Sequence, residues 1–405
     1  MSIKPIVHRP TSPARIEQVT IGNFRSLQRV DFRAITPLTV LLGANGSGKS
    51  TFFDVFAFLS DCFSEGLRRA VDKRGKFSDL RSRGQTGPIT FEVAYREGGW
   101  IEGSRPGLVR YHLEIDELDG RPVVASEWMH WKRGSWGKPF RFLDYRYGQG
   151  SVISGALPEQ DDTKIDLPLA APDVLAVSTL GQLADNPRVK SLRDFIVGWH
   201  LSYLSTSDTR VVPEAGPQEH LSRNGGNLAN VIQFLSERHP EVLDRIFSIL
   251  RRRIPKLESV SPVSLPTGHL LLTVKDAPFE EGVQARYVSD GTLKMLAYLI
   301  QLHDPAPPPF LGIEEPENFL HPKLLHELAE ECEMASRKMQ MVVTTHSPFF
   351  INALVPAQVW ALRRNDFGYT EAIRASAMAG VAEQMGQGAK LGQLWLEGYF
   401  EAGNP

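Results

Sequence analysis

The stretch Gly43-Ala44-Asn45-Gly46-Ser47-Gly48-Lys49-Ser50 decides the fold of this chain. It matches the pattern G-x-x-x-x-G-K-[ST], which is informative only between a buried strand and a helix. The residues before it, Leu38-Thr39-Val40-Leu41-Leu42, are apolar and β-prone, as in a buried parallel strand. Apolar residues recur after it at three- and four-residue steps from Phe52 to Phe63, as on one face of a helix. The sequence therefore predicts a phosphate-binding loop in an α/β fold.

The residue types of this loop suit a nucleotide phosphate. Its glycines let the backbone curl so that N–H groups point inward at an anion, and the helix N-terminus adds positive potential. Lys49 would reach the β and γ phosphates, and the Ser50 hydroxyl would bind Mg²⁺. An ordinary glycine-rich turn does not account for the flanking strand and helix. We expect bound ATP or GTP, with these contacts: Gly43, Asn45, Gly46, Ser47, Gly48, Lys49, Ser50 and Thr51.

A second apolar strand, Phe310-Leu311-Gly312-Ile313, ends in Glu314-Glu315-Pro316-Glu317. Carboxylates at the end of a strand beside a phosphate loop hold the metal and activate the attacking water. We assign Glu314 to Mg²⁺ and Glu315 to the general base. Aspartate is more usual in the metal position, so the longer Glu314 implies a less direct contact. An exposed acidic loop would not explain the strand before it.

A third buried strand, Met341-Val342-Val343-Thr344-Thr345, is followed by His346. A neutral imidazole there can hydrogen-bond the γ phosphate and link it to the carboxylate that positions water. A lone histidine is more often structural. Its place at the end of a strand after the acidic pair favours a catalytic role for His346.

Ser289-Asp290-Gly291-Thr292 precedes an apolar helix that begins near Leu293. A serine hydroxyl, backbone N–H groups and a helix N-terminus make a second anion site, to which we assign Ser289 and Gly291. One γ phosphate does not need two such sites in one subunit, so each would face the nucleotide of the other subunit. The alternative is a plain N-cap serine, which the sequence also satisfies. We expect a homodimer that closes on ATP.

These motifs together resemble the ABC-type ATPases, in the branch that contains RecF, SMC proteins and OLD-like bacterial predicted ATPases. The segments that carry the resemblance are Ile21–Leu27, Ser289–Thr292, Glu314–Pro322, Thr344–Pro348, Leu391–Trp395 and Gly398. The resemblance implies an ABC-type ATPase head and a loop, Asn318 to His321, that signals between two ATP sites. His321 stands where transporters place aspartate. The fold class predicted is therefore α/β, a P-loop NTPase of the ABC-type head kind.

The resemblance also implies a glutamine that senses the nucleotide. It would follow a strand between the phosphate loop and Ser289-Asp290-Gly291-Thr292, which we call the signature. Gln182, which follows Asp173-Val174-Leu175-Ala176-Val177-Ser178, is our candidate. Gln85 and Gln149 are the alternatives.

Composition and length limit the organisation of the chain. The 405 residues, 42% of them hydrophobic, suit two or three domains with a packed core. No apolar run is long enough to span a membrane, and two cysteines without metal spacing favour reduced thiols in a cytoplasm. We predict a mobile leader at 1–15, an ATPase core at 16–60 and 256–405, and an inserted lobe at 61–255. The lobe would hold a β meander at about 89–150 and helices at about 170–255, without long coiled coils.

Three basic segments are candidates for contact with nucleic acid, although the net charge of −2 gives no global signature. Arg68 to Arg83 holds seven basic residues against two acidic ones. The second segment is Arg251-Arg252-Arg253 with Lys256. In the third, Lys132, Arg133, Lys138 and Arg141 alternate with Trp131, Trp136, Phe140 and Phe142, as in stacking surfaces. Solvated charges and sheet core are the plain alternatives.

The favoured function is an Mg²⁺-dependent ATPase that acts as a dimeric clamp or sensor on DNA, in double-strand break or replication-associated repair or in anti-phage defence. A rival is a nucleotide-switched module that recruits a separately encoded effector with little turnover. The ATPase of a membrane transporter is disfavoured by the style of the motifs. An OLD-type nuclease is disfavoured by the short remainder of the chain after His346.

Overall fold

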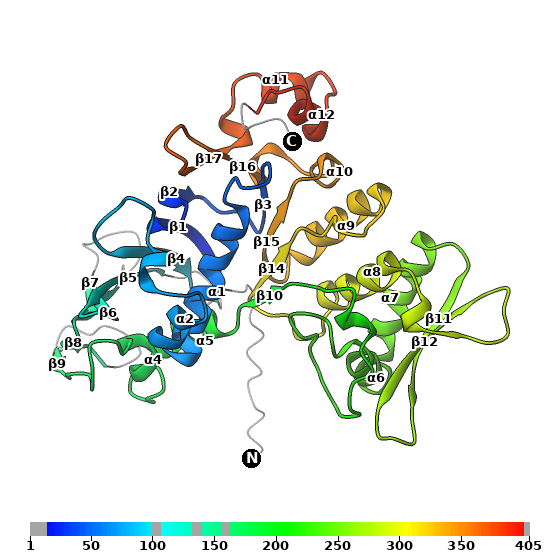
Figure 1. Ribbon diagram of the computed structural model, residues 1–405, viewed down its shortest axis with the longest axis horizontal. Helices are drawn as coiled ribbons and strands as arrows, with labels where there is room; N and C mark the ends of the chain where they lie inside the picture. The colour runs from blue at the N-terminus through cyan, green and yellow to red at the C-terminus, as the bar shows by residue number, and fades with distance from the viewer. Residues whose placement is uncertain (1–13, 99–106, 132–139, 155–162, 401–405) are drawn as a thin grey trace, which may run out of the picture. The chain divides into compact units, whose positions relative to one another are not determined.

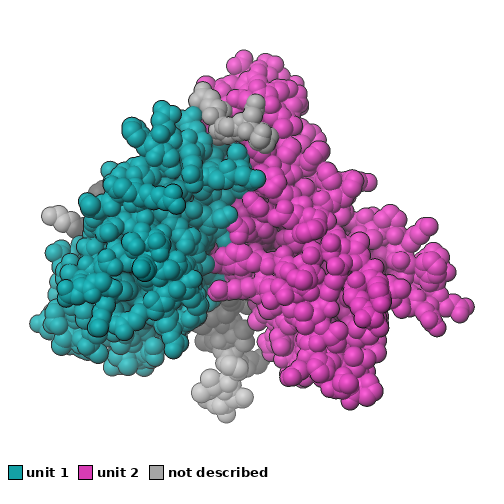
Figure 2. Space-filling view, viewed as in Figure 1, with its two compact units in different colours: residues 1–39, 43–199, 360–374 teal, residues 40–42, 200–359, 375–405 magenta. Residues whose placement is uncertain are grey.

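The computed structural model describes residues 14–98, 107–131, 140–154 and 163–400 (Figure 1). Figure 2 colours two compact units: residues 1–39, 43–199 and 360–374, and residues 40–42, 200–359 and 375–405. The leader predicted for 1–15 lies almost wholly outside the described residues. The predicted core and inserted lobe have other bounds than these units and stay a prediction.

An eight-stranded antiparallel sheet dominates the first unit, in the order β2-β1-β4-β5-β6-β7-β8-β9. Its strands are β1 (Arg15–Phe24), β2 (Leu27–Arg33), β4 (Ile89–Arg96), β5 (Leu108–Leu118), β6 (Arg121–Trp131), β7 (Phe140–Arg146), β8 (Gln149–Val152) and β9 (Ile165–Asp166). In β5 buried residues alternate with half-buried ones, because successive side chains point to opposite faces. The meander predicted at about 89–150 corresponds to β4 through β8.

Helix α1 (Lys49–Glu65) packs on this sheet through phenylalanines. The ring of Phe58 lies 5.7 Å from that of Phe24 on β1 and 5.7 Å from that of Phe91 on β4. Phe52 and Phe63, at the ends of the predicted apolar stripe, are buried as well. The other helices of this unit are α2 (Leu67–Asp72), α3 (Phe77–Leu80), α4 (Ala176–Leu180) and α5 (Pro187–Val197).

A six-stranded sheet has the order β10-β14-β15-β3-β16-β17. Its strands are β10 (His200–Ser202), β14 (Phe310–Glu314), β15 (Gln340–Thr345), β3 (Leu38–Leu42), β16 (Val359–Arg364) and β17 (Thr370–Arg374). β10, β14 and β15 run parallel, whereas β16 and β17 form an antiparallel hairpin. β3 and β15 are buried along their whole length, which explains why neither strand contains a charged residue.

The second unit is mainly helical and carries a small antiparallel sheet in the order β11-β12-β13. These strands are β11 (Leu257–Ser264), β12 (Leu270–Asp276) and β13 (Val283–Gln284). The helices are α6 (Leu228–Arg238), α7 (Pro240–Arg253), α8 (Asp290–Leu302), α9 (Pro322–Ala335), α10 (Pro348–Ile351), α11 (Val381–Gly386) and α12 (Leu391–Leu396). Short 3₁₀ turns lie at Asp208–Arg210, Ala285–Tyr287, Pro356–Gln358 and Ala375–Ala377. Within the described ranges no helix is both long and apolar enough to cross a membrane.

Candidate functional site

The phosphate loop runs directly into α1, whose N-cap is Gly48 with a φ of 106°. Lys49 is only 4% exposed, and its Nζ donates to the carbonyl oxygens of Gly43 at 2.8 Å and Ala44 at 3.1 Å. The ammonium group therefore lies inside the curl of the loop. The Ser47 hydroxyl is buried and has no hydrogen-bond partner in the described part of the chain. A buried hydroxyl without a hydrogen-bond partner destabilises the folded state, and a bound phosphate oxygen would accept a hydrogen bond from it.

The other predicted loop residues lie around this curl. Asn45, Gly46 and Ser50 are exposed, and Thr51 is half-buried in the first turn of α1. These positions leave the side chain of Ser50 accessible, as a residue that meets a ligand must be.

Thr370 of β17 holds the loop from the side, within the same unit. Its hydroxyl lies 2.9 Å from the carbonyl oxygen of Ser47 and 2.9 Å from the hydroxyl of Ser26. A Cβ atom on Gly48 would lie 2.2 Å from that same hydroxyl oxygen, and the residue has positive φ. Only glycine meets both requirements. No local sequence signal points to Thr370, because it is far from the loop along the chain.

The acidic pair lies at the carboxyl end of β14. Glu314 is the last residue of this strand and pairs in register with Thr344 of the parallel strand β15. Glu315 turns away from the strand with a φ of 41°, and its N–H donates to the carbonyl oxygen of Thr344 at 3.0 Å. The carboxyl ends of parallel strands meet at one sheet edge, so this turn places Glu315 beside the residue that follows β15.

That residue is His346, and two carboxylates lie beside it. Its Nδ1 is 3.8 Å from Oε1 of Glu315 and 3.0 Å from Oε1 of Glu317. The same oxygen of Glu317 accepts the backbone N–H of His346 at 2.6 Å and the hydroxyl of Thr345 at 3.0 Å. The Glu317 side chain is 7% exposed. Sequence reasoning gave Glu317 no role, and its signal was only a third carboxylate in the same acidic run.

The predicted signature begins α8. Ser289 is its N-cap, and the Ser289 hydroxyl accepts the N–H of Thr292 at 3.2 Å. Arg210 fixes the same turn, because its Nη2 lies 2.7 Å from Oδ1 of Asp290 and 2.6 Å from the carbonyl oxygen of Val288. The N-cap alternative is therefore present in the structure, and the role of Ser289 in a second anion site stays a prediction. Sequence reasoning missed Arg210.

The start of α8 touches the segment after the acidic pair. A Cβ atom on Gly291 would lie 3.0 Å from the carbonyl oxygen of Phe319, and Nζ of Lys294 donates to the carbonyl oxygen of Asn318 at 3.0 Å. Burial lowers the pKa of Lys294. His321, at the other end of this segment, caps α9 by accepting the N–H of Lys323 through Nδ1. The signature and the predicted signalling loop thus form one packed region.

The prediction that a strand precedes Gln182 is wrong, whereas the role of Gln182 as nucleotide sensor stays a prediction. The preceding residues form α4, because the buried carboxylate of Glu127 accepts the N–H groups of Ala176 and Val177 at the start of that helix. Burial raises the pKa of Glu127 to about 7. Gln182 lies in the turn after α4 and donates to the carbonyl oxygen of Ser178 at 3.1 Å.

The two alternative glutamines also have defined places. Gln85 donates to the hydroxyl of Tyr369 at 3.0 Å, and Gln149 is exposed at the start of β8. None of these contacts favours one of the three glutamines as the nucleotide sensor.

The residues predicted for Mg²⁺ carry oxygen ligands, and their assignment stays a prediction. The Ser50 hydroxyl and the Glu314 carboxylate are hard oxygen ligands, which Mg²⁺ prefers. Within the described ranges no group of three or more histidine, cysteine, aspartate or glutamate residues could hold a metal by itself. A metal with few protein ligands completes its shell with phosphate oxygens and water.

Comparison with known proteins places this geometry in a family. A family model described as "AAA domain, putative AbiEii toxin, Type IV TA system" matches residues 38–120 and 143–352. The chain belongs to this family. The match to this AAA-domain family spans the phosphate loop, the signature, the acidic pair and His346. A search of curated proteins found no match.

Solved structures show the same fold as this AAA-domain chain. A crystal structure of the SmcHead bound to the C-winged helix domain of ScpA matches with a TM-score of 0.55 and 15% identity, over 88% of this chain and 97% of that one. The Smc head domain with an extended coiled coil, bound to the C-terminal domain of ScpA derived from Pyrococcus furiosus, gives 0.54 and 13%, over 92% and 99%. The predicted fold class is confirmed, and these structures show the SMC-like resemblance at the level of the fold.

Proposed function

We propose that this protein binds ATP with Mg²⁺, hydrolyses it, and acts as a homodimer on DNA. The observation that carries the proposal is the cluster at the ends of β14 and β15, where Glu315 lies 3.8 Å from His346. An ATPase needs a carboxylate to take a proton from water and a second group near the γ phosphate. The family of AAA domains and the phosphate loop support the same reaction.

Each residue of this machinery has a distinct part in the proposal. Lys49 and the backbone N–H groups of the loop bind the phosphates in the ground state. Glu315 accepts a proton from the attacking water, while His346 donates a hydrogen bond toward the γ phosphate. Bound Mg²⁺, held by Ser50 and Glu314, would supply neutralisation of the phosphate charge. Glu317 accepts the backbone N–H of His346 and so fixes the turn that carries the imidazole.

The homodimer rests on the signature. The N-terminus of α8 with the Ser289 hydroxyl is suited to an anion. The phosphate loop with Lys49 already provides one phosphate site per chain. We propose that Ser289 and Gly291 of one protomer complete the site of the other. Asp290 is fixed by Arg210, so the turn that carries these residues is preformed.

DNA is the proposed partner, in repair or in defence. A second candidate, the nucleotide-switched module that recruits a separate protein, is favoured by one observation. The similar solved Smc heads are each bound to a domain of ScpA, a separate protein. ATP turnover with and without DNA distinguishes the two candidates, because only an enzyme that acts on DNA should be stimulated by it.

The test of the ATPase compares two variants. Lys49→Ala should abolish binding of a fluorescent ATP analogue, since Lys49 contacts phosphate in the ground state. Glu315→Gln should keep that binding and lower phosphate release by about a hundredfold or more, since a general base matters mainly in the transition state. Phosphate release by Glu315→Gln within a few-fold of the unaltered protein would refute this assignment.

A further inference from the structure

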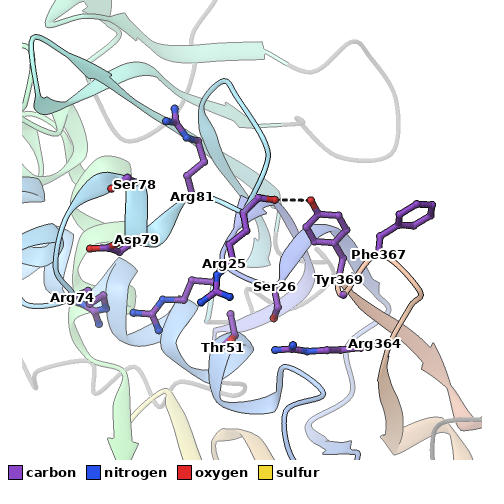
Figure 3. A pocket seen from close by; sticks show the side chains of 12 residues that line it. Arg25, Ser26, Thr51, Arg74, Ser78, Asp79, Arg81, Arg364, Phe367 and Tyr369 are labelled. Carbon is purple, nitrogen blue, oxygen red and sulfur yellow. Dashed lines mark hydrogen bonds between the residues drawn. The ribbon is translucent and has the colours of Figure 1, made fainter.

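The first unit contains a pocket of about 890 Å³ whose walls hold five arginines (Figure 3). They come from four segments: the β1–β2 turn, the residues after α2, the residues after α3, and the end of β16. In chain order they are Arg25, Arg74, Arg81, Arg83 and Arg364. Asp79 is the one carboxylate in the wall, and its Oδ2 accepts the backbone N–H of Lys76 at 2.9 Å. We call this hollow the arginine pocket.

Two of the five guanidinium groups are neutralised by carboxylates of α1. Arg25 lies 2.9 Å from Asp54, and Arg74 lies 2.8 Å from Asp54 and 2.8 Å from Asp61. These pairs hold the arginines against α1 rather than leaving them for a ligand. Charge pairing inside the protein therefore removes Arg25 and Arg74 as strong anion-binding groups.

The other three arginines have no carboxylate partner in the described part of the chain. Arg83 and Arg364 make no ion pair there, and Arg81 lies over the ring of Phe77 at 5.4 Å. Three unpaired guanidinium groups against Asp79 leave surplus positive charge in a hollow. Focused charge of this kind attracts an anion.

The basic segment predicted from Arg68 to Arg83 is thus divided by the fold. Arg68 pairs with Asp173 at 3.0 Å, and Lys73 pairs with Glu65 at 2.6 Å. Together with Arg74, they are used within the protein. Arg69 and Lys76 stay exposed outside the pocket, and Arg81 and Arg83 at the end of the segment line the arginine pocket.

Aromatic rings lie beside this charge. Tyr369 lines the pocket, and its hydroxyl donates to the carbonyl oxygen of Arg83 at 2.7 Å, so its ring is held in place. Phe367, in the same β16–β17 turn, is 84% exposed. Rings that flank arginines offer stacking surfaces for unpaired bases.

ATP alone does not account for this charge. The pocket borders the phosphate loop, because Ser26 and Thr51 belong to its wall. Lys49 and the loop N–H groups already serve the triphosphate, however, and the adenosine end of ATP carries no charge. The surplus guanidinium groups offer sites for further phosphates.

We propose that the arginine pocket binds the phosphate backbone of a single nucleic-acid strand, with a base against Tyr369 or Phe367. This inference rests on the proposed action on DNA and names the place where the strand is held. It places Arg83 and Arg364 on phosphates and the β16–β17 turn on a base.

The test measures binding of a fluorescein-labelled oligo-dT strand by fluorescence anisotropy. Arg83→Ala with Arg364→Ala should weaken binding about tenfold or more. The slope of log affinity against log salt should become shallower by about 1.4, or 0.7 for each lost phosphate contact. The matched control, Arg68→Ala with Arg69→Ala, removes the same charge from the basic segment outside the pocket and should change affinity less than about twofold. Equal losses in the two double variants would overturn the proposal.

Two more measurements distinguish strand binding in the pocket from misfolding of the variant and from ATP binding. Arg83→Lys with Arg364→Lys keeps the charge and should retain most of the strand affinity, whereas a loss caused only by misfolding would not depend on charge. A fluorescent ATP analogue is titrated in parallel. If the alanine pair loses analogue binding while strand binding is unchanged, the pocket belongs to ATP and the proposal is wrong.

The proposed ATPase can fail independently of the pocket. If the unaltered protein binds the strand and the alanine pair shows the tenfold loss, but the unaltered protein releases no phosphate from ATP with Mg²⁺, the pocket proposal is supported and the ATPase proposal is refuted. If the unaltered protein releases phosphate but binds no strand, only the proposal of strand binding in the arginine pocket is refuted.

Discussion

One oxygen of Glu317 lies close to the imidazole of His346 and accepts the backbone N–H of the same residue. Oε1 lies 3.0 Å from Nδ1 of the imidazole and accepts the backbone N–H at 2.6 Å. The other oxygen, Oε2, is buried without a hydrogen-bond partner among the described residues. A buried carboxylate needs hydrogen-bond donors, and the donors to Oε1 are the hydroxyl of Thr345 and the backbone N–H of His346, so Glu317 is tied to the turn that carries His346.

The first prediction therefore concerns Glu317→Gln. The amide keeps an oxygen for the backbone N–H but removes the charge beside the imidazole. We expect kcat for ATP hydrolysis to fall by about tenfold to a hundredfold, as for other partners that orient a functional histidine. Affinity for a fluorescent ATP analogue should be kept. The matched control is Glu330→Gln, because Glu330 is exposed on α9 and lies 3.7 Å from His326. Equal kcat in both variants would show that Glu317 only supports the fold.

The second prediction concerns the contact between Thr370 and the phosphate loop. Thr370→Val keeps the shape but leaves the buried carbonyl oxygen of Ser47 without this hydroxyl. We expect the free energy of unfolding in urea to fall by about 1–3 kcal/mol, the usual cost of an unsatisfied buried group. Binding of the ATP analogue should weaken too, since the loop loses its lateral support. Thr370→Ser restores the hydroxyl and should recover both quantities; loss of both in that variant would attribute the effect to the methyl group.

Local patterns were sufficient for the strands and the loop that carry the motifs. β3, β14 and β15 are short and buried, and each was predicted from a continuous apolar run with polar residues at its carboxyl end. The same kind of run misled at α4, where Ala176–Leu180 is helical. A short apolar run cannot distinguish strand from helix, and the buried carboxylate that caps α4 comes from distant β6.

Side-chain pairs between residues far apart along the chain could not be predicted from local sequence patterns. The basic segment from Arg68 to Arg83 looked uniform, yet carboxylates of α1 and Asp173 pair with part of it. Thr370 reaches the loop from 323 positions along the chain. For the aromatic basic segment, Lys132, Arg133, Trp136 and Lys138 lie outside the described residues, whereas Phe142 is buried and Arg141 pairs with Asp144. In the second basic segment, Arg253 pairs with Glu327 and Glu331.

The third prediction is a loss of stability in acid that depends on His200. Burial lowers the pKa of His200 to about 4, below its ordinary value of 6.5. Its Nε2 accepts from Nε2 of Gln301 at 3.3 Å, so a proton there would face a donor. The unfolded chain takes up this proton below about pH 6.5 and the folded chain does not, so the folded state loses stability as pH falls from 6.5 to 4.

The measurement is urea unfolding at several pH values, compared with His200→Gln. Between pH 7 and pH 4 the unaltered protein should lose about 3 kcal/mol more than the variant, from a difference of about 2.5 pKa units. Parallel curves for the two proteins across this range would contradict the prediction.

The fourth prediction concerns Ser289 and the proposed dimer. Ser289→Arg places a long cation where the γ phosphate of the partner must meet a hydroxyl and backbone N–H groups. It should abolish hydrolysis and ATP-driven dimerisation, while each protomer still binds the ATP analogue through its own Lys49. Light scattering with ATP and Glu315→Gln protein would show the closed dimer directly. A variant that hydrolyses ATP fully as a monomer would refute the two-subunit mechanism.

Mixing two inactive variants gives the sharper form of this test. Ser289→Arg spoils the signature of one protomer, and Lys49→Ala spoils the phosphate loop of the other. In a head-to-tail heterodimer each site combines the loop of one protomer with the signature of its partner. One site then carries both changes and the other carries neither, so phosphate release should reappear on mixing. Two catalytic sites that are each complete within one chain would give no recovery, because every chain in the mixture carries a change in its own site.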